Sequence, residues 1–155
     1  MTSYTIETPE AMHELGLSLG ATFKAGDLVL LTGPLGAGKT TLTRGIGEAL
    51  GAIGNVSSPT FVIARTHKLE QRECVFVHVD AYRLSSAAEL DDLDIDFENS
   101  ITVVEWGKGY TDGITDRWLE IEIERDHTGE SELRQVTVTE HNTAEPKNAA
   151  EAKNV

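Results

Sequence analysis

The chain of 155 residues has the length of one domain, and its 39% hydrophobic content is enough for one core. Thirteen Lys and Arg stand against 26 Asp and Glu, and the net charge of −13 argues against strong direct binding of nucleic acid, whose phosphate backbone it repels. Residues 1–10 lack a secretory signal pattern and no apolar run reaches the roughly 18 residues that cross a membrane, so we expect a cytoplasmic protein without membrane contact.

The first third of the chain predicts a helix, a strand and a second helix. Thr8 followed by Pro9 is typical of an N-cap and first turn, and apolar residues at helical spacing extend this helix to about Lys24. The run Leu-Val-Leu-Leu at 28–31 indicates a strand that is buried on both faces. Residues 39–50 have helical composition, which Gly51 ends.

The middle and the end of the chain predict further strands and one short helix. Residues 61–68 and 74–79 fit two strands, and Cys74 is expected to be a buried residue of the second. Ser86 and Glu89 form a capping-box pattern, which predicts a helix over 87–93. Residues 101–104 indicate another buried strand. Residues 118–124 alternate apolar and acidic side chains, so we expect a half-exposed strand with 133–140 as its hairpin partner.

This order of elements predicts an α/β domain over residues 1–140. The expected fold is P-loop NTPase-like, with a mainly parallel sheet flanked by helices and a C-terminal β-hairpin. From about His141 the composition becomes Ala, Glu, Lys, Asn and Pro with almost nothing large and apolar. Residues 141–155 are therefore expected to form a disordered tail.

A phosphate-binding loop lies between the buried strand and the second helix. It matches the pattern G-x-x-x-x-G-K-S/T at every defined position. Glycines let the backbone wrap closely with its N–H groups turned inward, and the helix start adds partial positive charge. Lys39 is expected to reach the β- and γ-phosphates of ATP, and the Thr40 hydroxyl to bind Mg²⁺. The predicted nucleotide-binding residues of the loop are Gly33, Leu35, Gly36, Ala37, Gly38, Lys39, Thr40 and Thr41.

Two predicted strands end in an acidic residue, Asp80 and Glu105. Such a loop needs carboxylates, because Mg²⁺ prefers oxygen ligands and the attacking water must be oriented. The carboxyl ends of strands line the ligand crevice of α/β sheets. Both acids are therefore candidates for the metal and for catalysis.

Three other features have two interpretations each. The six carboxylates of residues 89–98 could bind a metal, but apolar residues among them favour a solvated helix face. His78 could be catalytic, although a packed strand histidine is the more common situation. Trp106 could stack on a base or cover the site, or it could belong to the core.

Four motifs together resemble the bacterial TsaE family over residues 8–124. They are Gly33-Pro34-Leu35-Gly36-Ala37-Gly38-Lys39-Thr40-Thr41, Ser58-Pro59-Thr60-Phe61, His78-Val79-Asp80-Ala81-Tyr82-Arg83-Leu84 and Val104-Glu105-Trp106, in the family's order and spacing. The resemblance implies an ATPase that makes threonylcarbamoyladenosine in tRNA together with a TsaD–TsaB heterodimer.

The same resemblance implies a role for individual residues. Lys39 would be the phosphate lysine, Thr40 and Glu105 the magnesium ligands, and Thr41 and Asp80 residues needed for turnover. Residues 58–60 look like a switch segment near the γ-phosphate, and Trp106 follows the metal glutamate. Adenine would be contacted around Thr8 to Met12. Ala81 departs from the family, because a larger apolar residue is common there.

Three other functions are weighed against this one. A small-molecule kinase usually carries several arginines in a lid, whereas the seven arginines here are scattered. A GTPase switch would need an N-K-x-D guanine reader, which the sequence lacks. An ATP-dependent assembly module with little turnover stays open.

Overall fold

A seven-stranded sheet runs through the molecule in the strand order β1-β7-β6-β2-β5-β4-β3. The protein is described from a computed structural model, which describes residues 1–57, 63–126, 128 and 130–143. The strands are β1 (Thr2–Ile6), β2 (Leu28–Thr32), β3 (Ala64–Lys68), β4 (Val75–Asp80), β5 (Ser100–Glu105), β6 (Arg117–Arg125) and β7 (Arg134–Asn142). The helices are α1 (Pro9–Gly20), α2 (Lys39–Leu50) and α3 (Ala87–Asp91), with 3-10 turns at Ala81–Arg83 and Phe97–Asn99.

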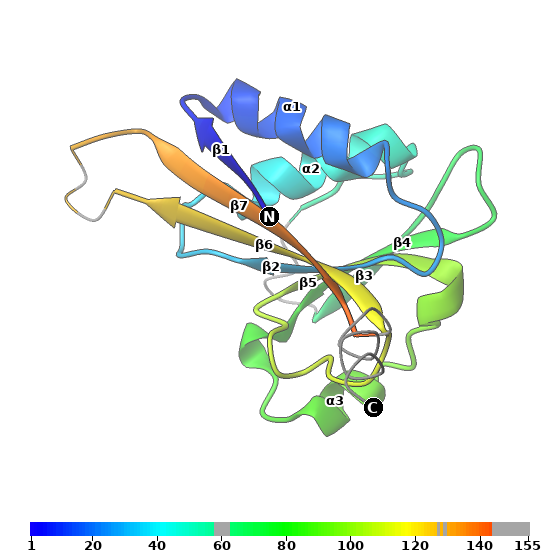
Figure 1. Ribbon diagram of the computed structural model, residues 1–155. Helices are drawn as coiled ribbons and strands as arrows, with labels where there is room; N and C mark the ends of the chain where they lie inside the picture. Colours follow the sequence, from blue (N-terminus) through cyan, green and yellow to red (C-terminus); the bar gives the residue numbers. More distant parts are fainter. Residues whose placement is uncertain (58–62, 127, 129, 144–155) are drawn as a thin grey trace, which may run out of the picture.

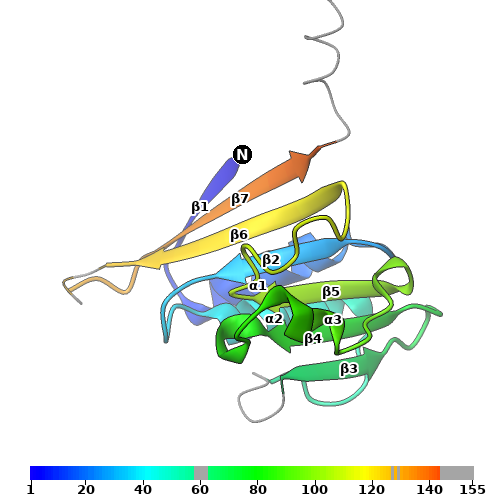
Figure 2. The same cartoon turned by 90° about the horizontal axis from the view of Figure 1, so that it is seen from below.

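The four central strands β6, β2, β5 and β4 are parallel, and the strands outside them pair antiparallel. Helices α1 and α2 cover one face of the sheet, while α3 and its flanking turns lie against the other (Figure 1, Figure 2). This is the predicted α/β class, with the β6–β7 pair as the expected hairpin. Because β2, β4 and β5 are parallel, their carboxyl ends meet at one edge of the sheet.

Helices α1 and α2 pack unusually closely, and two glycines allow it. A Cβ atom at Gly45 would overlap the backbone carbonyl of His13, and one at Gly16 would overlap that of Leu42. The apolar side of α2 then reaches the sheet, where Leu42 and Ile46 are fully buried. The packing fixes α2, and with it the glycine-rich loop at its start.

The helix expected to reach Lys24 ends at Gly20. The Thr22 hydroxyl donates to the carbonyl of Leu19 at 2.7 Å, and the Asp27 carboxylate accepts from the N–H of Lys24 at 2.8 Å. These side chains compete with helical hydrogen bonds and form a turn instead. The start of the helix is as predicted, because the Thr8 side chain accepts from the N–H of Ala11.

Strand β1 has no counterpart among the predicted elements. It is an edge strand that pairs only with β7, in the register Thr2 to Val138. Its side chains are mostly exposed, so it lacks the local apolar signal of a buried strand. Its partner lies more than a hundred residues away in the chain, and local patterns contain no information on such a pairing.

The sheet extends past the expected domain boundary at residue 140. Strand β7 ends at Asn142, and His141 pairs with Trp118 of β6. The two rings stack with their centroids 5.0 Å apart. This correction has a physical reason, since a ring contact across two strands cannot be read from composition. Residues 144–155 lie outside the described residues, so their disorder stays a prediction.

The expected capping box at α3 is not formed. Ser86 is the N-cap but its side chain makes no cap hydrogen bond, and Glu89 accepts instead from the N–H of Ser85 at 2.7 Å. The helix ends at Asp91 rather than at residue 93. Leu90 is fully buried, which supports the solvated-face interpretation of the acidic run. Within the described residues no group of His, Cys, Asp or Glu is arranged to bind a metal by itself.

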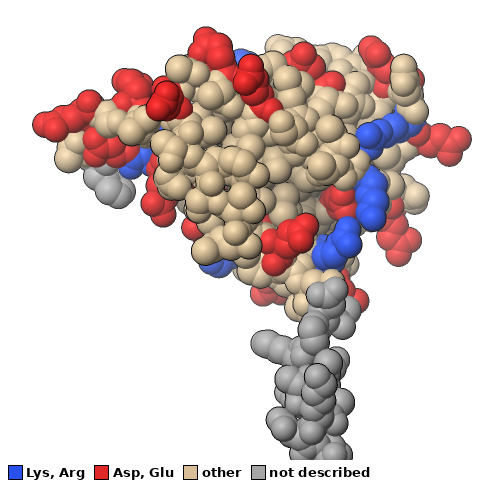
Figure 3. Space-filling view, turned by 45° about the horizontal axis from the view of Figure 1, so that its top comes forward, with Lys and Arg blue, Asp and Glu red and all other residues tan. Residues whose placement is uncertain are grey.

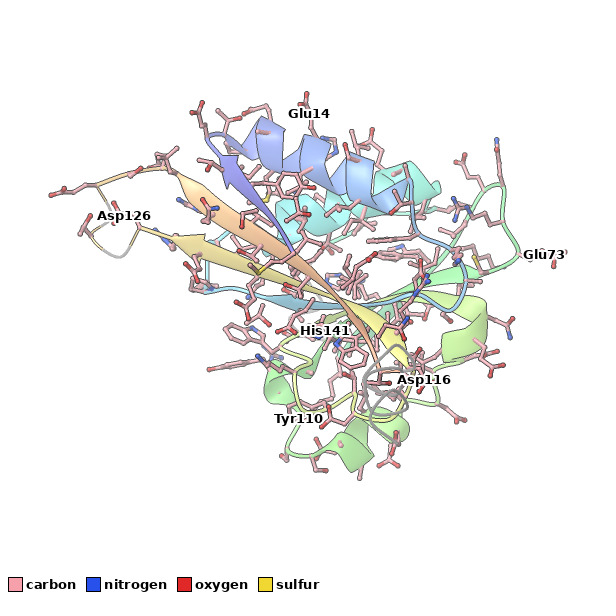
Figure 4. The ribbon with its side chains drawn as sticks, viewed as in Figure 1. Glu14, Glu73, Tyr110, Asp116, Asp126 and His141 are labelled. Carbon is pink, nitrogen blue, oxygen red and sulfur yellow. The ribbon has the colours of Figure 1, made fainter. Side chains whose placement is uncertain are left out.

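Two smaller features complete the fold. Cys74 lies one residue before β4 and is only partly buried, so the prediction of a buried strand residue is corrected there. On the α3 side of the sheet, the Tyr110 hydroxyl donates to the carbonyl of Leu84 at 2.9 Å (Figure 4). No helix in the described part of the chain is long and apolar enough to cross a membrane.

Candidate functional site

The glycine-rich loop connects the end of β2 to the start of α2. Gly36 and Gly38 have φ angles of 77° and 109°, which side chains rarely adopt, so both turns require glycine. Ala37 is buried between them, and its N–H donates to the carbonyl of Pro34 at 3.0 Å. Gly38 is also the N-cap of α2, whose first N–H groups are therefore directed at the loop.

Lys39 lies folded over the loop from the first position of α2. Its Nζ donates to the carbonyl of Gly33 at 2.6 Å and lies 4.5 Å from the centre of the Trp106 ring. The nearest carboxylate oxygen is Oε1 of Glu105, 4.0 Å away. Burial lowers the pKa of the Lys39 ammonium below its usual 10.5, and the charges of Glu105 and Asp80 partly oppose that shift.

Asp80 and Glu105 lie side by side, because they are register partners at the ends of the parallel strands β4 and β5. Asp80 Oδ1 accepts from the N–H of Tyr82 at 3.0 Å, which holds its carboxylate at the turn. Glu105 is only 4% exposed, and its Oε2 lies 2.8 Å from Nε2 of the fully buried His78. The two acids thus differ: one is half-exposed and the other is enclosed.

Two aromatic residues border the acids. Trp106 has a φ of 59°, a left-handed conformation that is strained for a large residue. This turns the chain directly after Glu105 and brings the indole beside Tyr82, with ring centroids 5.7 Å apart. Trp106 therefore lies at the cavity wall and outside the two core clusters, and its contact with a ligand stays a prediction. Tyr82 is 72% exposed at the rim.

A cavity of about 650 Å³ separates the loop from the acids. Its walls are Pro34 to Thr41 on one side and Asp80, Tyr82, Glu105 and Trp106 on the other. Besides the backbone of the loop, its lining offers one ammonium on Lys39, the hydroxyls of Thr40, Thr41 and Tyr82, and two carboxylates. This set fits a polyphosphate with Mg²⁺, an ion that binds through one or two protein oxygens plus phosphate rather than a cage of protein ligands. Thr40 and Glu105 are the two that would hold the ion.

A second cavity of about 260 Å³ adjoins the first along the loop. Thr8, Pro9 and Met12 from the start of α1 line it together with Gly36 to Gly38 and Thr41. Arg134 and Glu132 close it from the β6–β7 hairpin. Thr41 borders both cavities.

The structure brings almost all the predicted site residues together around these two cavities. Gly33 does not line either cavity, but its carbonyl accepts from Lys39. Leu35 is 93% exposed at the rim. The motif of residues 58–61 lies outside the described residues.

Sequence reasoning did not assign three residues that contact the site. Tyr82 borders the cavity, and Arg125 donates to the carbonyl of Leu35 at 3.1 Å. His78 is a packed strand histidine, the more common of its two interpretations, and it also contacts Glu105. The regular spacing of His78 and Asp80 on one strand face was the available signal.

Acidic side chains are spread over the surface around this fold (Figure 3). On the face seen in Figure 3, Lys and Arg form a short row at one side rather than a broad patch. In Figure 4, Glu14 points away from the sheet on α1 and Asp126 lies near the tip of the β6–β7 hairpin. The distribution fits the negative net charge of the chain.

Comparisons with known proteins agree with one another. The family model described as threonylcarbamoyl adenosine biosynthesis protein TsaE matches residues 6–136. A tRNA threonylcarbamoyladenosine biosynthesis protein TsaE of Streptomyces coelicolor is 53% identical over 83% of this chain and 89% of its own length. The protein of the same name in Bacillus subtilis is 35% identical over 84% of this chain and 80% of its own. The crystal structure of Bacillus subtilis YdiB superposes with a TM-score of 0.71 and 25% identity, covering 97% of this chain and 92% of that one.

Proposed function

Because the chain belongs to the TsaE family of tRNA threonylcarbamoyladenosine biosynthesis, we propose that it is a Mg-ATP-dependent P-loop ATPase acting in that modification. Its partners in the proposal are TsaD and TsaB subunits. The cytoplasm, where tRNA is modified, is the proposed location.

The observation that carries the proposal is the pair of opposed walls around the larger cavity. A glycine-rich backbone with a lysine faces two carboxylates at the ends of neighbouring parallel strands. In phosphoryl transfer the protein contributes mainly positioning and electrostatic stabilisation, and these are the groups it uses. The volume of about 650 Å³ lies within the usual range for small-ligand sites.

Individual residues take roles that follow from their positions. Lys39 would leave the carbonyl of Gly33 and bind the β- and γ-phosphate oxygens. Thr40 and Glu105 would hold Mg²⁺, which supplies charge neutralisation on the phosphates when bound. Asp80 is the group proposed to orient the attacking water, and Thr41 would support the phosphates from the first turn of α2.

The smaller cavity is the proposed place of the nucleoside. It adjoins the phosphate side of the loop and is bordered by Thr8 and Met12, the segment in which an adenine contact is expected. A ligand that spans both cavities would be a nucleotide. Thr41, which borders both, would lie near the junction of its two parts.

The distribution of arginines favours a partner-dependent ATPase over a kinase. Among the described residues no arginine lines the larger cavity, and Arg83, the arginine of the motif after Asp80, is exposed outside it. The lid of a small-molecule kinase would place several arginines at this cavity. An arginine supplied by another protein is worth about 10³ to 10⁵ in rate in other P-loop proteins.

Co-purification tests the proposal directly. The tagged chain is mixed with candidate TsaD and TsaB subunits, with Mg-ATP, with Mg-ADP and without nucleotide. The expected result is a complex whose amount depends on the nucleotide. The proposal would be contradicted if the isolated chain bound tRNA tightly and in a salt-sensitive way but had no affinity for either subunit.

A further inference from the structure

His78 is a buried polar residue that has no role in the proposed function. It is fully buried on β4, two residues before Asp80 and therefore on the same face of the strand. Phe76, on that face as well, stacks on its ring at 6.5 Å between centroids. A buried imidazole is unfavourable unless its nitrogens are hydrogen-bonded, so its partner matters.

That partner is the carboxylate of Glu105. The Nε2 to Oε2 distance is 2.8 Å, and both side chains are almost completely enclosed. Within the described part of the chain, the other ring nitrogen, Nδ1, has no hydrogen-bond partner. An ionised carboxylate can only accept, so Nε2 is the donor. The contact uses one oxygen of Glu105 and leaves Oε1, which lies 4.0 Å from Lys39, on the side of the glycine-rich loop.

We propose that His78 is a positioning residue, which holds the Glu105 carboxylate so that its other oxygen is presented to the magnesium ion of the bound nucleotide. This inference rests on the proposed Mg-ATP site and adds a residue to which no role has been given. Glu105 has three rotatable side-chain bonds, and the hydrogen bond from His78 determines which carboxylate oxygen faces the loop. Hydrogen bonds from outside the ligand shell orient metal ligands in this way in other metal sites.

The consequence is specific to the metal. If His78 only filled space, its replacement would lower stability and weaken all nucleotide binding alike. If it positions Glu105, its replacement lowers magnesium affinity while the glycine-rich loop still binds the phosphates. The loss of such a partner typically costs about 10- to 100-fold in metal affinity.

The experiment measures ATP affinity by calorimetry across a magnesium series and in excess EDTA. Magnesium is expected to enhance ATP affinity, and His78→Leu should raise the magnesium concentration that gives half of this enhancement about 10- to 100-fold. The ATP affinity measured in EDTA should change less than about threefold. His78→Gln keeps an N–H donor and is expected to recover part of the enhancement. His67→Leu is the matched control, because His67 is another buried histidine of this sheet whose hydrogen bond goes to the carbonyl of Ile53.

Each result separates the two proposals. Equal losses with magnesium and with EDTA in His78→Leu, or no recovery in His78→Gln, would overturn the positioning role and leave the Mg-ATP site standing. In a Glu105→Gln background, adding His78→Leu should change the magnesium dependence no further, and an additional loss there would also overturn it. Failure of the unmodified chain to bind Mg-ATP would overturn the proposed function itself.

Discussion

The two walls of the larger cavity are built in different ways. The glycine-rich wall consists of consecutive residues that present mainly backbone groups, and its outer turn is open, with Leu35 93% exposed. The acidic wall is assembled from two strands, and its inner carboxylate, on Glu105, is 4% exposed and bonded to a buried histidine. In the proposed function, the first wall would bind phosphate without the second. Substitutions on the two walls should therefore separate nucleotide binding from metal binding and turnover.

The largest expected effect comes from the acidic wall. Asp80→Ala should lower the rate of phosphate release in the partner complex by about 10² to 10⁴ while ATP stays bound, because a water-orienting group acts mainly in the transition state. Single-turnover phosphate release, together with ATP affinity, measures both effects. Asp91→Ala, an exposed acid on α3, is the control. Equal losses of affinity and rate in Asp80→Ala would remove the distinction between the walls.

The next effect concerns the glycine-rich wall. Mg-ATP at 100 times its dissociation constant should stabilise the unmodified chain by about 2.7 kcal/mol, and Lys39→Ala should abolish most of this gain. Thermal melting with and without Mg-ATP gives the comparison. If Mg-ATP did not change the melting temperature of the unmodified chain, the proposed nucleotide site would be wrong.

A smaller effect, on stability, should arise behind the glycine-rich wall. Gly45→Ala places a methyl group against the carbonyl of His13, so α1 and α2 must separate. Overpacking of this kind costs about 1 to 3 kcal/mol, which is roughly 2 to 4 °C in Tm per kcal/mol for a chain of this size. Ser18→Ala, on the exposed side of α1, is the control. A Gly45→Ala protein as stable as the unmodified chain would show that the helices can move apart freely.

The smallest effect is a pH dependence that sharpens the role of Lys39. Burial lowers the pKa of this lysine below 10.5. In the nucleotide-free protein, Lys39 therefore loses its positive charge at a lower pH than an exposed lysine would. Phosphate binds the charged form, and Mg-ATP affinity should therefore fall as the pH rises through that lowered value. The buried charge also destabilises the folded protein, and this cost disappears as the pH rises from the lowered pKa toward 10.5. Calorimetry at alkaline pH tests this, with Lys39→Arg expected to bind more weakly but without the decline.

Local sequence was sufficient for the glycine-rich wall. The loop and α2 are consecutive in the chain, and residues 39–50 form the predicted helix from end to end. The two acids could also be paired from the sequence, because parallel strands bring their carboxyl ends to one edge. These predictions needed only strand–helix order and the positions of Asp80 and Glu105.

Other features depend on register and distant pairing. His78 and Glu105 are 27 residues apart, and their contact exists only because β4 and β5 pair in the register that places Asp80 beside Glu105. Strand β1 likewise needs β7 from the opposite end of the chain, and the last residues of β7 need the first residues of β6. Trp106 reaches the site because its φ angle is positive, and no pattern in the sequence predicts a positive φ at a tryptophan.

We propose that this chain provides a nearly complete ATP site whose turnover depends on a partner. This proposal is tested most directly by initial rates of phosphate release from Mg-ATP, measured for the isolated chain and for its mixture with the TsaD–TsaB pair. We expect slow release alone and an increase of about 10³-fold or more in the mixture, as for other P-loop proteins that receive an arginine from a partner. Full speed from the isolated chain, unchanged by TsaD–TsaB, would show that turnover does not depend on these partners.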